Sequence, residues 1–283
     1  MSMAEVQLQP RGGRLSVLIV FAFLVIAVVT VMAMLGRLLA PADPSAQTLL
    51  DARQRPSAGH LLGTDALGRD VFSRLLSGAS LTVLGPFIVT VCAALIAVPL
   101  GLLAASRGRL VETVIMRLAD TLLAIPSMLV IIVVVGLLGG SYWLAIGVLV
   151  VLIVPSGLRL IHSAATSQQN LPYLEAARTM GTSRRRLMFV HVLPNLLPTV
   201  VATFLLDFVT ALVSLSALAF LGVGAPPGSA DWGSMLSEGL RLVDVNLWAA
   251  VGPAVLLILA SFSVTAVGDW AYARLEGDQH AAR

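Results

Sequence analysis

Long apolar runs alternate with short polar segments along most of the chain. Six runs stand out, at about residues 15–35, 81–105, 118–138, 143–161, 196–223 and 247–267. A helix needs about 20 consecutive, mainly apolar residues to cross the hydrocarbon core of a bilayer, and the runs have about that length. The pattern therefore predicts an all-α polytopic membrane protein with about six transmembrane helices.

The polar segments divide the chain into an expected order of parts. These are an N-terminal segment (1–14), a first span (15–39), a loop (40–80), a core of five spans (81–270) that contains the polar segment 162–195, and a tail (271–283). The first apolar run is longer than the roughly 7–15-residue core of a signal peptide. We therefore expect it to stay in the protein as an uncleaved span.

Arginine is distributed unevenly among the polar segments. All 18 basic residues are arginines. If the N-terminus lies inside, 12 of them fall in inside segments and 6 in outside segments, and short cytoplasmic loops carry such an excess. We expect both termini and residues 162–195 at the cytoplasmic face of a bacterial plasma membrane, with residues 40–80 and 224–246 outside.

The absence of lysine limits the chemistry of the chain. A P-loop needs its lysine to reach the phosphates of a nucleotide, so this chain carries no ordinary P-loop. The four histidines are scattered, Cys92 is the only cysteine, and no GxSxG or Ser/His/Asp arrangement can be recognised. We expect no catalytic residue, no metal site and no cofactor bound by this chain.

A compact basic segment, YLEAARTMGTSRRRLMFVHVLPN (173–195), interrupts the apolar runs. Pro172 suits the first turn of a helix and Gly181 suits the position just past its end, so the two predict a short helix. A second helix carries Arg184–Arg186 and runs toward Pro194. The segment is predicted to be a helix–glycine–helix unit.

Such a unit can anchor the chain at the membrane surface, bind nucleic acid, or dock a cytoplasmic protein. Nucleic-acid binding requires a recognition helix that is free to enter a groove, but the second helix leads directly into the span at Leu196. An anchor explains the arginines but not the alanine pair Ala176–Ala177 beside Glu175. Small alanines let a partner approach closely and Glu175 offers a charge, so docking of a protein is favoured and no nucleic acid is expected.

The sequence EAARTMG, followed by HVLP, resembles the EAA loop of ABC importer permeases. Four further stretches are similar to the dipeptide and oligopeptide (C-type) branch: HLLGTDALGRDVFSRLLSGASLTV (60–83), RLADTLLAIPSMLV (117–130), ALAFLGVGAPPGSADWGSML (217–236) and GDW (268–270). The similarity extends over nearly the whole chain from His60. The tail departs from the usual Asp-Pro-Arg ending, and Leu215 stands where relatives often carry a glutamate.

The resemblance implies the type I ABC importer permease fold and a set of partners. It places an ATPase-coupling surface at Glu175, Ala176, Ala177, Arg178 and Gly181. It also implies a second, B-type permease subunit, two ABC ATPase subunits that bind ATP and Mg, and an extracytoplasmic binding protein. The expected function is that of the permease subunit of an importer for dipeptides or oligopeptides. The alternatives are nickel, glutathione or another small solute, and, outside transport, a membrane-embedded enzyme or channel.

A polar stripe lies within the fifth apolar run. At about 100° per residue its members fall within an arc of roughly 80°; they are Thr199, Thr203, Asp207, Thr210 and Ser214. An aspartate near mid-span costs about 2.5–3.5 kcal/mol on insertion scales, so it should not face lipid. We interpret the stripe as the lining of a water-filled pathway. For Asp207 itself two roles stay open: contact with substrate, or pairing with a polar group on a neighbouring helix or partner chain.

The loop before the second span contains two acid-first i,i+4 pairs, Asp65–Arg69 and Asp70–Arg74. Such pairs stabilise a helix, and the apolar residues between and after them share one side. The loop is therefore predicted to include an amphipathic helix that lies on the outer surface or caps the spans. Further along, Pro126 is expected to kink the third span because it lacks a hydrogen-bond donor.

Overall fold

The computed structural model describes residues 16–168, 171, 174, 177, 179–226 and 228–281, the last six of these by their backbone alone. Regular structure within these residues is helical, with one isolated bridge between Thr64 and Asp70. Five helices are long and apolar enough to cross a membrane: α1 (Val17–Leu39), α2 (Val71–Ser106), α5 (Tyr142–Gln168), α9 (Leu197–Phe220) and α11 (Trp248–Ala281). The predicted all-α membrane protein is confirmed.

The third apolar run forms two helices rather than one. α3 (Arg109–Leu123) and α4 (Ser127–Leu137) meet at a break that includes Pro126 and are bent by 77°. Proline has no N–H to continue the hydrogen-bond ladder of a helix, and here the expected kink is a full interruption. Counted as one broken span, the pair brings the number of candidate spans to six.

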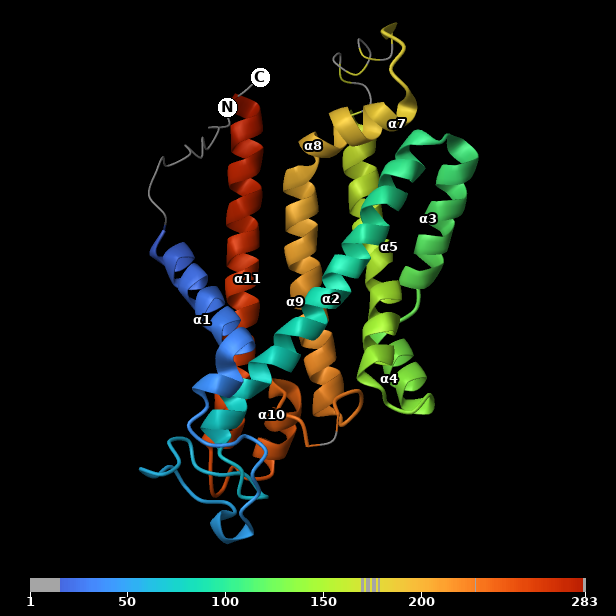
Figure 1. The fold of residues 1–283 in the computed structure, drawn as a ribbon. Helices are drawn as coiled ribbons and strands as arrows, with labels where there is room; N and C mark the ends of the chain where they lie inside the picture. The colour runs from blue at the N-terminus through green and yellow to red at the C-terminus, as the bar shows by residue number, and fades with distance from the viewer. Residues whose placement is uncertain are drawn as a thin grey trace, which may run out of the picture.

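Figure 1 shows a bundle in which α2 crosses diagonally from one end of the molecule to the other. α1 starts and α11 ends toward the side where α7 (Arg184–Arg186) lies. The loop before α2, with the short helix η1 (Leu49–Asp51), and α10 (Trp232–Leu240) lie at the opposite end. We call the end with α7 the inner end and the end with α10 the outer end, after the sides of the membrane on which the sequence predicts them. This relative placement agrees with the one expected from the arginine distribution.

Small residues let the central helices pack closely. Gly101 of α2 lies directly against α5, because a Cβ built on it would stand 2.9 Å from the Cβ of Ile161. Gly157 of α5 faces α2 in the same way, with its built Cβ 3.4 Å from the Cβ of Ala97. In lipid no hydrophobic force drives helices together, so close approach at small residues supplies much of the attraction. α2, α5 and α9 therefore form the centre of the bundle.

Two helix boundaries differ from the expected ones. α2 begins at Val71 rather than near residue 81, so the apolar residues expected in a separate amphipathic helix form its first turns. Asp70 starts the helix there by accepting hydrogen bonds from the backbone N–H of Ser73 (2.8 Å) and from its hydroxyl (2.7 Å), as an N-cap carboxylate does. At the other terminus, α11 continues through most of the expected tail to Ala281.

Candidate functional site

Residues 173–195, for which we predict an ATPase-coupling role and which we call the coupling segment, contain at the inner end the helix terminus that the sequence predicts. Gly181 has a φ of +78°, in the left-handed region that glycine adopts without penalty. The N–H of Thr182 donates to the carbonyl of Ala177 at 3.2 Å, the bond that closes a helix ending in a left-handed glycine. Three predicted coupling residues lie outside the described part of the chain: Glu175, Ala176 and Arg178.

The described residues of this first helix lie on a buried side and an exposed side, and Thr179 is among the exposed ones. Leu174 and Ala177 are buried in an apolar cluster with Leu102 of α2, Ile161 of α5 and Leu187. Ala177 therefore supports the helix from its buried side, which differs from the exposed position expected for it. The burial means that a displacement of this helix acts directly on the inner ends of α2 and α5.

The helical run that follows is built from three short pieces. α7 continues into η2 (Leu187–Val192), which is π-helical, and then into α8 (Leu193–Asn195). Single π-helical turns inside helices frequently occur at functional sites, and this one lies just before Pro194, which has no N–H to donate. At the start of the run, the Arg184 guanidinium donates to the carbonyl of Ser106 at 3.0 Å. The run is thus tied to the last residue of α2.

The structure divides the polar stripe of α9 between two surroundings. Thr210 is exposed beside Leu206, which is 52% exposed, whereas Asp207 is buried. The remaining members are partly buried: Thr199, Thr203 and Ser214. The Thr203 hydroxyl donates to the Thr199 carbonyl at 2.8 Å, and the Thr210 hydroxyl donates to the Leu206 carbonyl at 2.9 Å. One side of the stripe is therefore not covered by the described part of this chain, while the other side faces the bundle.

Asp207 lies where α9 meets α5 and α2. A Cβ built on Gly157 would stand 3.5 Å from Asp207 Oδ2 and 3.3 Å from Cγ2 of Thr203, so the carboxylate lies over the glycine. Among the residues that the structure describes, none forms an ion pair with Asp207. Pairing with a charged group is therefore not found for Asp207 within the described part of the chain.

A buried ionic cluster joins the loop before α2 to α10 at the outer end. Arg69 Nε donates to Asp65 Oδ2 at 2.6 Å, and Arg69 Nη2 donates to Glu238 Oε2 at 2.9 Å. Arg74 Nη1 donates to the same two carboxylates, at 2.7 Å in the case of Glu238. We call these four residues the outer cluster. Its two positive and two negative groups balance, and both arginines and Asp65 are buried.

The expected ion pairs in this loop are only partly right. The pair Asp65–Arg69 is confirmed, although the chain between the two residues forms a turn and not a helix. Asp70 does not pair with Arg74, because its carboxylate caps α2 and contacts Nδ1 of His60 at 3.0 Å. Sequence reasoning missed Glu238, which lies 164 residues beyond Arg74 and gives no local signal.

The cluster also changes the acidity of Asp65. Burial pushes the pKa of this carboxyl group upward, because a low-dielectric surrounding disfavours the charged form. The backbone N–H of Arg69 and the positive charge of Arg74 outweigh that effect and hold the pKa below its usual value of 3.8. Asp65 is therefore held in its charged form by its neighbours.

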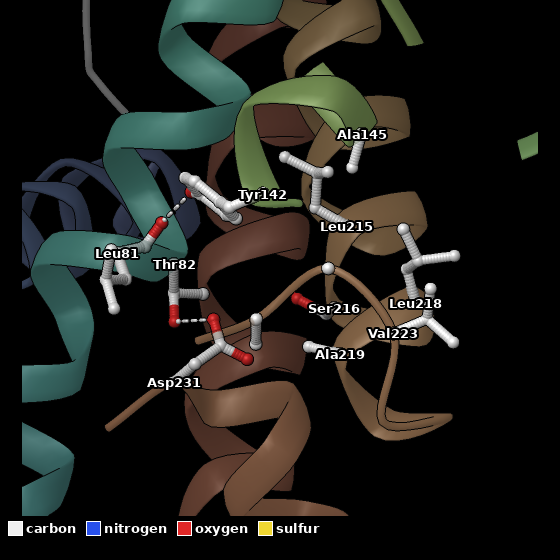
Figure 2. A pocket seen from close by; sticks show the side chains of 12 residues that line it. Leu81, Thr82, Tyr142, Ala145, Leu215, Ser216, Leu218, Ala219, Val223 and Asp231 are labelled. Atoms are coloured by element: carbon white, nitrogen blue, oxygen red, sulfur yellow. Dashed lines mark hydrogen bonds between the residues drawn. The ribbon is translucent and has the colours of Figure 1, made fainter. Parts of the chain in front are cut away.

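Helices α2, α5 and α9 and the loop that leads into α10 surround a small cavity near Tyr142 and Asp231 (Figure 2). The Tyr142 hydroxyl donates to the Leu81 carbonyl at 2.8 Å, and the Thr82 hydroxyl donates to Asp231 Oδ2 at 3.1 Å. The cavity between them has a volume of about 10 Å³, room for about one water molecule. Pockets for small ligands measure about 300–1,000 Å³, so this junction is a structural joint and not a substrate site.

Comparisons with known proteins identify relatives of the whole architecture. Residues 97–279 match the family described as binding-protein-dependent transport system inner membrane component. The dipeptide transport system permease protein DppC of Haemophilus influenzae is 32% identical over 250 residues, which cover 86% of this chain and 85% of that protein. The oligopeptide transport system permease protein OppC of Bacillus subtilis is 30% identical over 265 residues, which cover 94% and 86%.

A solved structure shares the fold. In an inward-facing conformation of the MetNI methionine ABC transporter, one chain matches with a TM-score of 0.59 at 18% identity, over 71% of this chain and 96% of that one. The type I ABC importer permease fold expected from the sequence is confirmed by this match. Because the family match covers more than half of its residues, the chain belongs to the family of binding-protein-dependent transport system inner membrane components.

Proposed function

We propose that this chain is the permease subunit of an ATP-driven importer and forms half of a membrane pathway for dipeptides or oligopeptides. The family is one of transport proteins, and the relatives described above are named as permeases for dipeptides and oligopeptides. The observation that carries the proposal is the left-handed Gly181 that closes the EAARTMG sequence at the inner end. Transport of nickel, glutathione or another small solute is the alternative, and the named relatives favour peptides.

The proposed complex contains four further subunits. They are a second, B-type permease, two ABC ATPases that bind ATP and Mg, and an extracytoplasmic binding protein that delivers the substrate. In a bacterial plasma membrane the inner end and both termini face the cytoplasm, because the arginine excess lies on that side. Closure of the ATPases on ATP moves the coupling segments and opens the pathway outward, and hydrolysis resets it. This chain itself carries no catalytic group in that cycle.

We assign the contact with the ATPase to Glu175, Ala176, Arg178 and Gly181, with Ala177 behind them. The burial of Ala177 against α2 and α5 gives the helix a route to both spans. The bond from Arg184 to the end of α2 adds a second route. Movement imposed on the coupling segment is then carried into the bundle at two points.

A matched pair of glycines tests the coupling role. Gly181 and Gly222 both have a φ of +78°, and a Cβ built on either has nothing within 4 Å. Alanine therefore adds the same backbone strain, about 1–2 kcal/mol, at the inner end in one case and beyond α9 in the other. Gly181→Ala should lower substrate-stimulated ATPase activity and uptake in proteoliposomes, while Gly222→Ala should leave the stimulation near the wild-type level.

Glu175→Ala supplies a second variant, which should uncouple transport while the complex stays assembled. Uptake at the wild-type rate in both Glu175→Ala and Gly181→Ala would remove the coupling assignment. An equal loss of stimulation in Gly181→Ala and Gly222→Ala would point to general strain instead.

We further propose that the stripe of α9 lines the pathway, where this chain meets the second permease. In a Cys92→Ser background, a cysteine at Thr210 or Ser214 should react with a small hydrophilic thiol reagent, and more so in one nucleotide state. A cysteine at Phe204 or Leu212, on other sides of α9, should not react. Equal reactivity at all four cysteine positions would contradict the pathway.

Asp207→Asn separates the two roles of the aspartate. If its charge acts in the pathway, the substitution changes transport alone, whereas if it forms an ion pair with a partner chain, the substitution changes assembly.

A further inference from the structure

A groove of about 370 Å³ opens at the inner end between the last turns of α2 and the helical run that starts at Arg184. Three arginines stand around it: Arg107, Arg184 and Arg185. Its floor is apolar and includes Pro99 and Leu103 of α2 and Phe189 of η2. We call it the inner groove. It combines strong positive charge with an apolar surface in one concave site.

The charge of the inner groove is not neutralised by the part of the chain that the structure describes. All three arginines are exposed, and no described carboxylate lies within ion-pair distance of them. Within the described residues, Arg184 donates to the carbonyl of Ser106 and no other hydrogen bond of its guanidinium group is found. Guanidinium groups bind phosphate in a bidentate way, so the groove suits a phosphate ester.

The apolar floor continues from the arginines into the membrane span. Leu95, Pro99, Leu103 and Arg107 follow one another at intervals of four residues and therefore share one face of α2. Leu95 is 70% exposed and Phe189 is 50% exposed. From Leu95 to Arg107 the helix rises about 18 Å, a strip that reaches well into the hydrocarbon layer. An acyl chain can cover such an apolar strip, whereas a soluble anion or an acidic protein segment has no apolar group that would lie along it.

A second groove gives a useful contrast. It measures about 690 Å³, lies between α1, α2 and α11, and is lined by residues without charge. It can accept hydrocarbon but has nothing to hold a charged headgroup. Charge complementarity therefore distinguishes the inner groove from the general lipid-facing surface.

We propose that the inner groove binds an anionic phospholipid, with its phosphate on Arg107, Arg184 and Arg185 and one acyl chain along Pro99 and Leu103. Basic pockets between transmembrane helices at the cytoplasmic side bind anionic headgroups in this manner. The lipid bridges the end of α2 and the run that follows Gly181. It thereby sets how firmly the coupling segment is held to the bundle, whichever solute is carried.

The test uses the purified complete transporter in detergent. It is titrated with phosphatidylglycerol or phosphatidylcholine, and bound lipid is counted by native mass spectrometry. Each basic residue near a membrane surface contributes a factor of about five in affinity for anionic lipid. Arg184→Gln should thus weaken phosphatidylglycerol binding about fivefold, and the Arg107→Gln/Arg184→Gln double variant about 25-fold. Arg186→Gln is the matched control, because Arg186 is exposed on the same turn and does not line the groove.

The outcomes separate the proposal from its rivals. Preferential loss of phosphatidylglycerol in the groove variants, with Arg186→Gln unchanged and phosphatidylcholine unaffected, supports it. An equal loss in Arg186→Gln indicates a diffuse positive surface and overturns it. Displacement of the lipid by glycerol 3-phosphate at a similar concentration indicates a site for a soluble phosphate, and this also overturns it, because the acyl chain would then contribute nothing.

Discussion

The outer cluster and the inner groove differ in the burial and the pairing of their arginines. In the outer cluster two arginines are buried, and each donates to both of two carboxylates. Around the inner groove three arginines are exposed, and no described carboxylate pairs with them. The outer cluster pairs its charges within the chain and ties the loop before α2 to α10. The arginines of the inner groove have no described carboxylate partner, so their charge is available to a ligand.

The difference matches what each end is proposed to do. Burying an ion pair costs desolvation, and the attraction between the charges only offsets that cost when the geometry is good. Such a cluster adds rigidity and specificity more than net stability. A rigid outer end suits a surface that receives a binding protein, whereas unpaired charge suits an end that meets ATPases and lipid.

Removal of one buried arginine should have the largest effect. Arg74→Gln leaves Asp65 and Glu238 opposite a single positive charge, and breaking a buried ion pair in this way costs about 3–5 kcal/mol. We expect a marked fall in the unfolding temperature of the purified complex and faster proteolysis within residues 40–70. Arg37→Gln is the control, because Arg37 is an exposed arginine in the last turn of α1. Similar losses in both variants would show that the outer cluster is not special.

Acid should destabilise the outer cluster, with a smaller fall in unfolding temperature than Arg74→Gln causes. The pKa of Asp65 in the folded protein lies below 3.8, so its contribution to stability is present above pH 3.8 and is lost as the pH falls through the lowered pKa. The difference in unfolding temperature between the wild type and Asp65→Asn should therefore narrow with falling pH in that range. A difference that stays constant down to pH 2 would contradict the role of the Asp65 charge.

The smallest effect on the unfolding temperature is expected for a substitution of an arginine at the inner end. Arg186 is exposed and makes no ion pair with a described residue. Surface substitutions of this kind change stability by less than about 0.5 kcal/mol. Arg186→Gln should thus unfold with the wild type in the same thermal measurement. A fall in unfolding temperature close to that of Arg74→Gln would mean that Arg186 contributes to stability as much as an arginine of the outer cluster does.

Much of the fold could be predicted because the bilayer imposes a length on each span. The six apolar runs gave the number of candidate spans, and the glycine signal placed the end of the coupling helix at Gly181. The break at Pro126 was expected as a kink, since the missing N–H is visible in the sequence. Its angle of 77° depends on how α4 packs on α5 and has no signature in the residues themselves.

The outer cluster shows where sequence reasoning stops. Spacing identified Asp65–Arg69, but it also suggested Asp70–Arg74, which does not form because Asp70 is used as the cap of α2. Glu238 was out of reach, since a contact across 164 residues is decided by tertiary packing. Ala177 was expected at the surface, where a small residue lets a partner protein approach closely. It is buried instead, because a small residue serves equally well where a helix packs against its own bundle.

The length of α2 has a mechanical consequence. Its 36 residues span about 54 Å, against a hydrocarbon layer of about 30 Å. The helix is therefore longer than an upright crossing requires, and Arg74 lies in its first turns. One continuous rod then links the Arg184 contact at Ser106 to the outer cluster. A displacement of α2 at its inner end is transmitted to its outer end unless the helix bends at Pro86 or Pro99. The stiffness of the helix at these two prolines therefore determines how large the displacement is at the outer end.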